Sequence, residues 1–390
     1  MVSNIRGAAA VVGLGQTPWY KRGTAPDSEF KMAVQAVVAA AEDAGISPRD
    51  IDGFVSWGSE NNTGQNMMSA LGTKELRFGS LMWTHGGGSA GSIGLAAMAI
   101  ATGQAEAVVV IRSMAEKGAG SRLSKAVYQG AEPPHERVNG WVLPAHGFAM
   151  GASRLLEANG LPRSAMRNFV RACYYHANQN PGAFAHNIQL DDETYDASPY
   201  PVEPLHIFDN SRENDCAIAL LLVSAERAKD LRQKPAYVLS GPMGRYGGMD
   251  VSAEQGPDGK TTAGFRSVAK RCWEESGYRP SDVDVAQIYA NASSAAVNAM
   301  IDHGFCDWEN VGEFMRLENI IAPNGGLPLN TAGGDMADGF IHGAGNNVEA
   351  VKQIRGTSTN QVPGAKLSLA VGGPNDSFVS TLLLGSEEVL

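Results

Sequence analysis

A glycine-rich segment beginning at His85 carries the residues best suited to chemistry in this sequence. It reads His-Gly-Gly-Gly-Ser-Ala-Gly-Ser and precedes a run of small residues. Residues 87–91 fit the G-x-S-x-G pattern that exposes a nucleophilic serine in hydrolases, here Ser89. The overlapping His-Gly-Gly-Gly resembles a lipase oxyanion loop, although hydrolases build these two features from separate segments. One hypothesis is therefore a Ser89 hydrolase, and the alternative is a glycine-lined helix N-terminus that suits an anion or an oxyanion.

Two other residues lie where sites collect in α/β folds. Tyr289 ends a strand-like apolar run, and strand ends are common places for binding and catalysis. His342 lies in a Gly-rich loop after Asn-Thr-Ala-Gly-Gly at 330–334. Gly13-Leu14-Gly15 does not predict a dinucleotide site, because no third glycine opens a helix after it, and a tight turn is the better interpretation.

Composition excludes several classes of protein. Of 390 residues, 43% are hydrophobic and 18% are charged, and the net charge is −10. This is a globular composition without a basic stripe, so we expect no nucleic-acid partner. The longest apolar runs, such as 216–225, are too short for a membrane span, and without a signal peptide we expect a cytoplasmic protein. Four cysteines without CxxC spacing and eight histidines without HxxxH or HExxH spacing predict neither a disulfide scaffold nor a metal site.

The most informative pattern is an internal repeat. Residues 42–57 align without gaps with residues 274–289, and each copy ends a helix at Gly, turns at Pro and enters a strand. A Gly-rich loop, a helix and an apolar strand then follow each copy. We therefore predict a duplicated α/β fold. The alignment places Tyr289 opposite Trp57, whose side chain we expect to be half-buried. A half-buried aromatic side chain without a catalytic role is also the alternative interpretation of Tyr289.

A segment of different composition separates the two copies. Residues from about 116 to 205 are rich in Pro, His, Asn and aromatic residues. We predict an inserted loop domain with short helices, such as Ser164 to Ala177, because long insertions on a rigid scaffold often cover a binding site. The N-terminal half is then residues 1–235, with the loop domain inside it, and the C-terminal half is residues 236–390.

The repeat, the insertion and the order of the motifs resemble the thiolase superfamily over essentially the whole chain. The closest type is the lipid-transfer, or sterol-carrier, thiolase. The matching segments are VVGLGQTPW at the first strand, GGGSAGS at 86–92 (nucleophile loop), IYANAS at 288–293 (His-Asp-Cys-Phe-Ser segment), NTAGGDMADGFIHG at 330–343 (Asn-Pro-Ser-Gly-Gly to Gly-His-Pro) and LAVGG at 369–373. The resemblance implies two similar halves in a layered αβαβα arrangement.

The departures from the thiolase pattern decide the expected chemistry. Gly88 occupies the position of the nucleophilic cysteine, Asn291 that of the second cysteine and Phe340 that of the Gly-His-Pro histidine. A glycine cannot carry an acyl group, so we do not expect thiolysis. The pattern is similar to the lipid-transfer-protein-like aldolases of bacterial steroid side-chain degradation. This resemblance implies retro-aldol cleavage of a bulky β-hydroxyacyl-CoA to a ketone and a short acyl-CoA, without a covalent intermediate.

The resemblance also implies roles for individual residues. Tyr289 is the expected acid/base, and backbone N–H groups near Gly88 and Gly372 are expected to hold the enolate oxygen. His342 is the expected second catalytic residue, standing in for a tyrosine that those aldolases carry near Phe340, and Tyr246 is the alternative candidate for that role. The remaining candidates for the substrate pocket are His85, Ser89, Tyr246, Asn291 and Phe340.

The same resemblance implies partners. We expect a homodimer core bound to a small protein with a zinc ribbon and an OB-fold, which together form a heterotetramer. No cofactor is expected in this chain, because the CoA thioester is the substrate and any zinc belongs to the partner. Two alternatives stay open: a non-catalytic acyl-CoA-binding subunit of a complex, and the Ser89 hydrolase.

Overall fold

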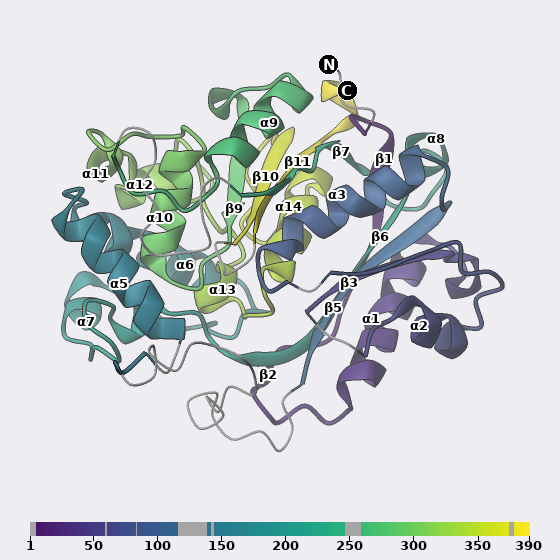
Figure 1. Cartoon of the computed structure of the whole chain (residues 1–390), viewed down its shortest axis with the longest axis horizontal. Helices are drawn as coiled ribbons and strands as arrows, with labels where there is room; N and C mark the ends of the chain where they lie inside the picture. The colour runs from purple at the N-terminus through teal and green to yellow at the C-terminus, as the bar shows by residue number, and fades with distance from the viewer. Residues whose placement is uncertain are drawn as a thin grey trace.

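A computed structural model describes residues 5–58, 61–82, 84–115, 139–141, 144–245, 259–373 and 378–390 (Figure 1). Within these ranges the backbone forms one mixed β-sheet covered by helices. The strands are β1 (Ala9–Gln16), β2 (Tyr20–Lys21), β3 (Gly53–Trp57), β4 (Phe78–Met82), β5 (Ala107–Met114), β6 (Asn214–Ser224), β7 (Ala236–Ser240), β8 (Met243–Gly244), β9 (Val285–Ile288), β10 (Leu367–Gly372) and β11 (Val379–Gly385).

The order of the strands confirms the duplication predicted from the sequence. The sheet runs β4-β3-β5-β6-β1-β7-β11-β10-β9, so β3-β5-β6-β1 of the first half correspond to β9-β10-β11-β7 of the second. In each half the first pair is parallel and the next two pairs are antiparallel. The half-sheets meet at β1 and β7, which pair through Ala10 with Tyr237 and Val11 with Ala236.

Helices form three layers around the two half-sheets. The helices are α1 (Glu29–Ala44), α2 (Gly64–Leu71), α3 (Gly88–Ala101), α5 (Pro144–Glu157), α6 (Arg163–Gln179), α7 (Asp192–Asp196), α8 (Ala225–Ala228), α9 (Arg266–Ser276), α10 (Ser293–Asp302), α11 (Val311–Phe314), α12 (Leu317–Ile320), α13 (Gly334–Ala337) and α14 (Ala344–Arg355), with short 3-10 turns η1 (Pro48–Asp50), η2 (Ile207–Asp209), η3 (Pro280–Asp282) and η4 (Glu387–Val389). Helices α3 and α14 contact each other and strands of both halves, so they form the central layer. Helix α1 packs outside the first half-sheet, and α9 outside the second.

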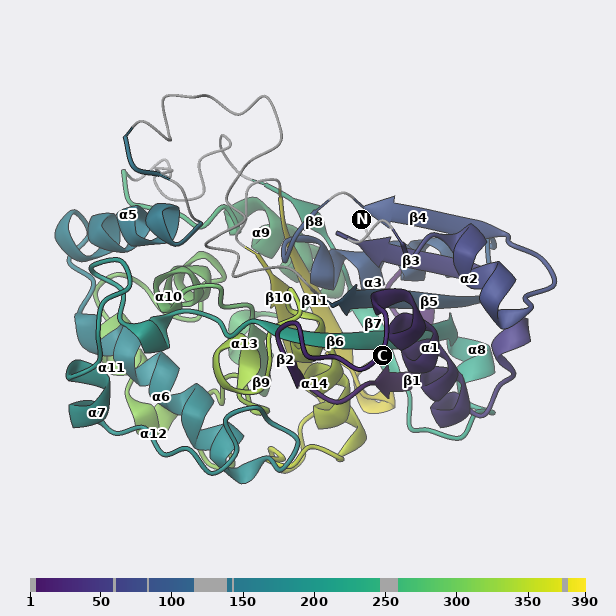
Figure 2. The same cartoon turned by 90° about the horizontal axis from the view of Figure 1, so that it is seen from below.

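The local signals explain these elements. Helix α1 begins after Ser28, whose side chain accepts the Lys31 N–H, and it ends at Gly45 in the left-handed conformation. Its counterpart α9 ends in the same way at Gly277, and a 3-10 turn and a strand follow in both copies. The predicted helix at 164–177 is confirmed as part of α6. Figure 2 shows α5, α6 and α7 gathered at the end of the molecule opposite α1 and α2.

Two local predictions were wrong. Gly13-Leu14-Gly15 forms no tight turn but lies inside β1. A Cβ on Gly13 or Gly15 would overlap the backbone of α1, so these glycines let the helix lie directly on the strand. Trp57 is fully buried, because it lies in the central apolar cluster under α3. In the described residues, no helix is long and apolar enough to cross a membrane.

Candidate active site between the two halves

The glycine-rich segment forms the N-terminus of α3, as the second of the two sequence hypotheses proposed. The helix begins at Gly88 without a side-chain cap. The Gly88 N–H donates to the His85 carbonyl and the Ser89 N–H to the Gly86 carbonyl, both at 3.1 Å. The predicted oxyanion role of the Gly88 N–H would therefore require the His85 carbonyl to share this hydrogen.

Gly88 has no room for the side chain that thiolases carry there. A Cβ built on Gly88 would overlap Oγ1 of Thr84, which is itself buried. The space that a nucleophilic side chain needs is thus filled by the threonine hydroxyl. The structure and the sequence agree that this position cannot hold an acyl group.

Tyr289 follows directly after β9 and lies against the glycine-rich segment from the other half. Its side chain is 1% exposed. A Cβ on Gly86 would lie 2.6 Å from the Tyr289 hydroxyl oxygen, and a Cβ on Gly343 would lie 2.9 Å from the ring atom Cδ2. Glycine at both positions therefore makes the space that the tyrosine occupies. This contact brings the two halves of the duplicated fold together at one hydroxyl group.

His342 belongs to the same cluster. Its backbone is in the left-handed region, at a φ of 53°. Its ring meets the rings of Phe340 and His85 edge to face, at centroid distances of 5.1 and 5.5 Å. Phe340 in turn lies 6.3 Å from Tyr289. Four of the aromatic residues predicted for the site therefore form a continuous group, with His85 the exposed member.

Asp335 holds the two segments that carry Tyr289 and His342. Its carboxylate accepts the N–H of Ala290 at 3.1 Å and the N–H of Gly343 at 3.2 Å, and each donor is adjacent to a catalytic candidate. Burial raises the pKa of the Asp335 carboxyl to about 7, against the opposing effect of these donors and of the Asn346 amide. Asp335 was not among the residues predicted from the sequence, although an acidic side chain within a glycine-rich apolar segment indicates a candidate site residue.

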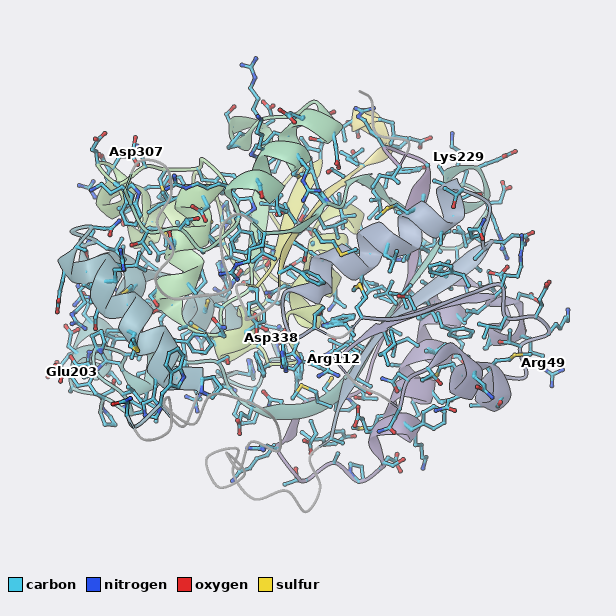
Figure 3. All side chains as sticks on the ribbon, in the orientation of Figure 1. Arg49, Arg112, Glu203, Lys229, Asp307 and Asp338 are labelled. Atoms are coloured by element: carbon cyan, nitrogen blue, oxygen red, sulfur yellow. The ribbon has the colours of Figure 1, made fainter. Side chains whose placement is uncertain are left out.

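Arg112 is the second residue that the sequence analysis missed. It lies in β5, is 4% exposed, and directs its guanidinium at Nδ1 of His342. Figure 3 labels it near the middle of the molecule. A single charge in an otherwise apolar strand was the available signal.

Ser89 and Gly372 lie beside this cluster. A Cβ on Gly372 would be 2.6 Å from Oγ of Ser89, and a Cβ on Gly343 would be 2.9 Å from the same atom. The Ser89 Oγ is buried and has no hydrogen-bond partner among the described residues. Asn291 lies at the base of α10, where its side-chain oxygen accepts the Ala292 N–H at 2.9 Å. Tyr246 lies outside the described residues.

None of the cysteines lies in the segments that carry the candidate site residues. Each of the four is buried, and burial raises the pKa of each thiol to about 12; they are Cys173, Cys216, Cys272 and Cys306. A thiol with such a pKa supplies almost no thiolate at neutral pH. No cysteine of this chain is therefore suited to carry an acyl group.

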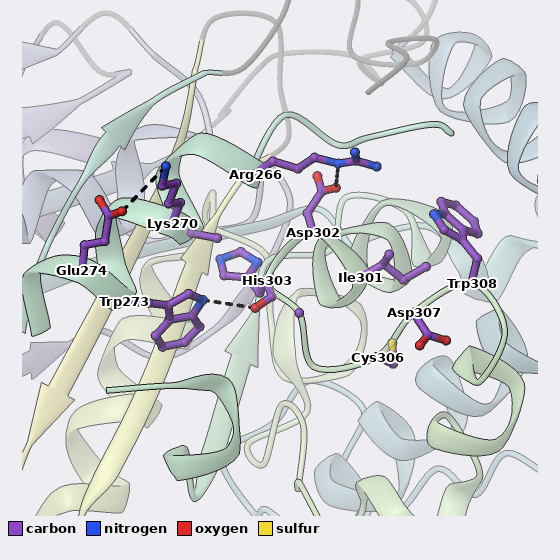
Figure 4. Close-up of a pocket in the computed structure, with 12 residues that line it drawn as sticks. Arg266, Lys270, Trp273, Glu274, Ile301, Asp302, His303, Cys306, Asp307 and Trp308 are labelled. Atoms are coloured by element: carbon purple, nitrogen blue, oxygen red, sulfur yellow. Dashed lines mark hydrogen bonds and ion pairs between the residues drawn. The ribbon is translucent and has the colours of Figure 1, made fainter. Parts of the chain in front are cut away.

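A separate cleft of about 590 Å³ lies between α9 and the end of α10 (Figure 4). None of the predicted site residues lines it. Its basic side chains are paired, Arg266 with Asp302 and Lys270 with Glu274. His303 lies buried there, and burial lowers its pKa to about 4. The predicted site residues that the structure describes therefore lie at the junction of the halves and not in this cleft.

The comparisons with known proteins identify the family of the chain. Residues 250–385 match a family model described as thiolase C-terminal domain-like. The chain is 32% identical to the 17-hydroxy-3-oxo-4-pregnene-20-carboxyl-CoA lyase of Mycobacterium tuberculosis, over 98% of this chain and 100% of that protein. It is also 32% identical to the steroid side-chain-cleaving aldolase of Thermomonospora curvata, over 99% and 100%. A solved structure titled Ltp2-ChsH2(DUF35) aldolase superposes with a TM-score of 0.91 at 31% identity, covering all of both chains. The duplicated fold and these full-length similarities show that the chain belongs to the thiolase superfamily, among its lipid-transfer-protein-type aldolases, which are carbon–carbon lyases.

Proposed function

We propose that this protein cleaves a bulky β-hydroxyacyl-CoA of the steroid side-chain type into a ketone and a short acyl-CoA. The observation that carries the proposal is the position of the Tyr289 side chain. Its hydroxyl lies against Gly86 where thiolases place a nucleophile loop, while the cysteine position is a glycine without room for a side chain. The relatives named above cleave carbon–carbon bonds, and one of them is named for a steroid carboxyl-CoA substrate.

The reaction balances without a covalent intermediate. The ionised Tyr289 oxygen takes the proton of the substrate's β-hydroxyl group. The bond between the α and β carbons breaks, and the β carbon leaves as a ketone. The electron pair of the broken bond stays with the α carbon and is shared with the thioester carbonyl as an enolate. Tyr289 then returns the proton to the α carbon, which gives the short acyl-CoA. A free tyrosine has a pKa of about 10, so the site must stabilise its anion.

The enolate oxygen needs donors fixed in place before the bond breaks. The N–H groups near Gly88 and Gly372 and the side chain of His342 are the proposed donors. Gly88 and His342 are the sequence neighbours of Ser89 and Gly343, and a Cβ on Gly372 or Gly343 would lie 2.6 or 2.9 Å from the Ser89 Oγ. The Ser89 hydroxyl is a further polar group at this point. It has no histidine base among its described partners, which favours the aldolase over the Ser89 hydrolase.

The proposal includes partners and a compartment. The neighbour structure is titled Ltp2-ChsH2(DUF35) aldolase, which supports a partner protein for the present chain. We propose that this partner is a small zinc-ribbon/OB-fold protein, that any zinc lies in the partner, and that this chain uses no cofactor besides the CoA thioester substrate. Strand β4 is one of the two edge strands of the sheet and precedes the glycine-rich segment. Leu81 in this strand is 38% exposed, and we propose that the homodimer contact forms there. The compartment proposed is the cytoplasm.

The test is to co-express the chain with its small partner and to incubate the complex with a panel of β-hydroxyacyl-CoA thioesters. We expect a ketone and a shorter acyl-CoA, with no requirement for free CoA. Tyr289→Phe is the matched inactive variant. Product that forms only when free CoA is added would instead show thiolysis. Tight binding of every thioester without product would favour the acyl-CoA-binding subunit.

A further inference from the structure

The hydrogen bonds of buried Arg112 determine which ring nitrogen of His342 carries the hydrogen. A buried guanidinium is costly unless its N–H groups reach acceptors. Its Nη1 donates to the Ser113 carbonyl at 2.7 Å. Its Nη2 and Nε lie 2.7 and 3.2 Å from Nδ1 of His342. Two N–H groups of one guanidinium therefore converge on a single ring nitrogen.

The direction of this hydrogen bond follows from the chemistry of the two groups. A guanidinium has donors only and keeps its proton in proteins, so Nδ1 of His342 must be the acceptor. A neutral imidazole carries one ring hydrogen, and that hydrogen is then on Nε2. Protonating Nδ1 would set its hydrogen against the guanidinium hydrogens and place two positive charges at hydrogen-bond distance.

We propose that Arg112 is a positioning residue that holds His342 as its neutral Nε2–H tautomer, so that His342 donates a hydrogen bond to the enolate oxygen. The inference rests on the proposed function for the identity of that acceptor. A Cβ on Gly343, the next residue, would lie 2.9 Å from both Tyr289 Cδ2 and Ser89 Oγ. The His342 ring packs against Phe340, whose ring centroid lies 6.3 Å from that of Tyr289, so the histidine belongs to the group around the candidate acid/base. The two side chains then divide the work: Tyr289 moves the proton and His342 stabilises the charge.

Nitrogen-15 NMR of the histidine-labelled full chain at about pH 7 reads the tautomer directly, because protonated and bare ring nitrogens differ in chemical shift. Loss of one signal pair in His342→Gln assigns the residue. We expect a bare Nδ1 in the wild type and in Arg112→Lys, and a mixture of forms in Arg112→Met. Arg77→Met, at a surface arginine, is the matched control. A protonated Nδ1 in the wild type, or an unchanged spectrum in Arg112→Met, would overturn the proposal.

Turnover separates the donor role from a base role. Glutamine keeps an N–H donor but cannot take a proton, whereas leucine does neither. We expect His342→Leu to lower kcat about 10²-fold and His342→Gln to stay within about tenfold of the wild type. Equal large losses would contradict the donor role. Because the NMR needs no substrate, a chain with the Nε2–H tautomer but no aldol cleavage would refute the proposed function and leave the tautomer assignment intact.

Discussion

Trp57 is the last residue of β3, and Tyr289 directly follows the equivalent strand β9; both are buried, at 0% and 1% exposure. They differ in what surrounds them. The Trp57 ring nitrogen is buried without a hydrogen-bond partner among the described residues. Tyr289 instead lies between Gly86 and Gly343, which leave space for its ring and hydroxyl. The duplication therefore supplies an aromatic residue twice, and the glycines around one copy turn it into a candidate for chemistry.

The largest effect should come from removing the Tyr289 hydroxyl, with a substitution of Trp57 at the equivalent position as the comparison. Tyr289→Phe should lower turnover by about 10²-fold or more, since proton transfer is lost, with little change in stability. Trp57→Phe should cost about 1–3 kcal/mol of unfolding free energy, since it leaves a cavity, and keep turnover. Steady-state kinetics and urea unfolding measure both. The comparison fails if Tyr289→Phe keeps full turnover.

The glycine that admits the tyrosine gives the next effect. Gly86→Ala places a methyl group on the Tyr289 hydroxyl and should lower turnover about 10- to 10²-fold by displacing it. Gly182→Ala is the control, because its Cβ would meet nothing nearer than Asn180 Oδ1 at 3.5 Å. Equal turnover in Gly86→Ala and the wild type would mean that the position of Tyr289 has no role in catalysis.

Restoring the thiolase cysteine should not restore thiolase chemistry. Gly88→Cys should destabilise the protein by about 1–3 kcal/mol through its overlap with Thr84. It should show no thiolysis of a β-ketoacyl-CoA. Thermal unfolding and a free-CoA-dependent assay test both points. A burst of acylated protein would show that the loop can accommodate the cysteine after all.

The smallest effect concerns the pH dependence of stability. The Asp335 pKa is raised from 3.8 to about 7, so the folded state binds a proton more tightly, and this group lowers stability as pH rises between these values. His176 and His303, lowered to about 4, act in the opposite direction. The histidine contributions are common to wild type and Asp335→Asn, so they cancel in the difference between their unfolding free energies. Urea unfolding at several pH values should show the variant gaining stability relative to wild type as the pH rises. A difference that does not depend on pH would contradict the assignment.

Much of the fold could be predicted because its signals are local or repeated. Gly45 and Gly277 end equivalent helices in the left-handed conformation, and the repeat itself requires two similar halves. The order of the glycine-rich segments gave the place of the candidate site. Trp57 was misjudged because its burial depends on α3, which packs on it from elsewhere in the chain.

The sequence could mark Arg112 and Asp335 as unusual, but the contacts that give them a role depend on the folded chain for the same reason. Arg112 and His342 are 230 residues apart, and only the folded chain brings them within a hydrogen bond. Asp335 matters because two N–H groups, from before α10 and before α14, converge on its carboxylate. Neither arrangement has a spacing that a linear motif could reveal.

The threonine hydroxyl beside Gly88 has a consequence for protein design. A Cβ at position 88 would overlap Oγ1 of Thr84, so a side chain there requires the threonine to rotate or to be replaced. Positions 84 and 88 therefore act as a pair, and a redesign that installs a cysteine at position 88 without strain needs a smaller residue at position 84 as well.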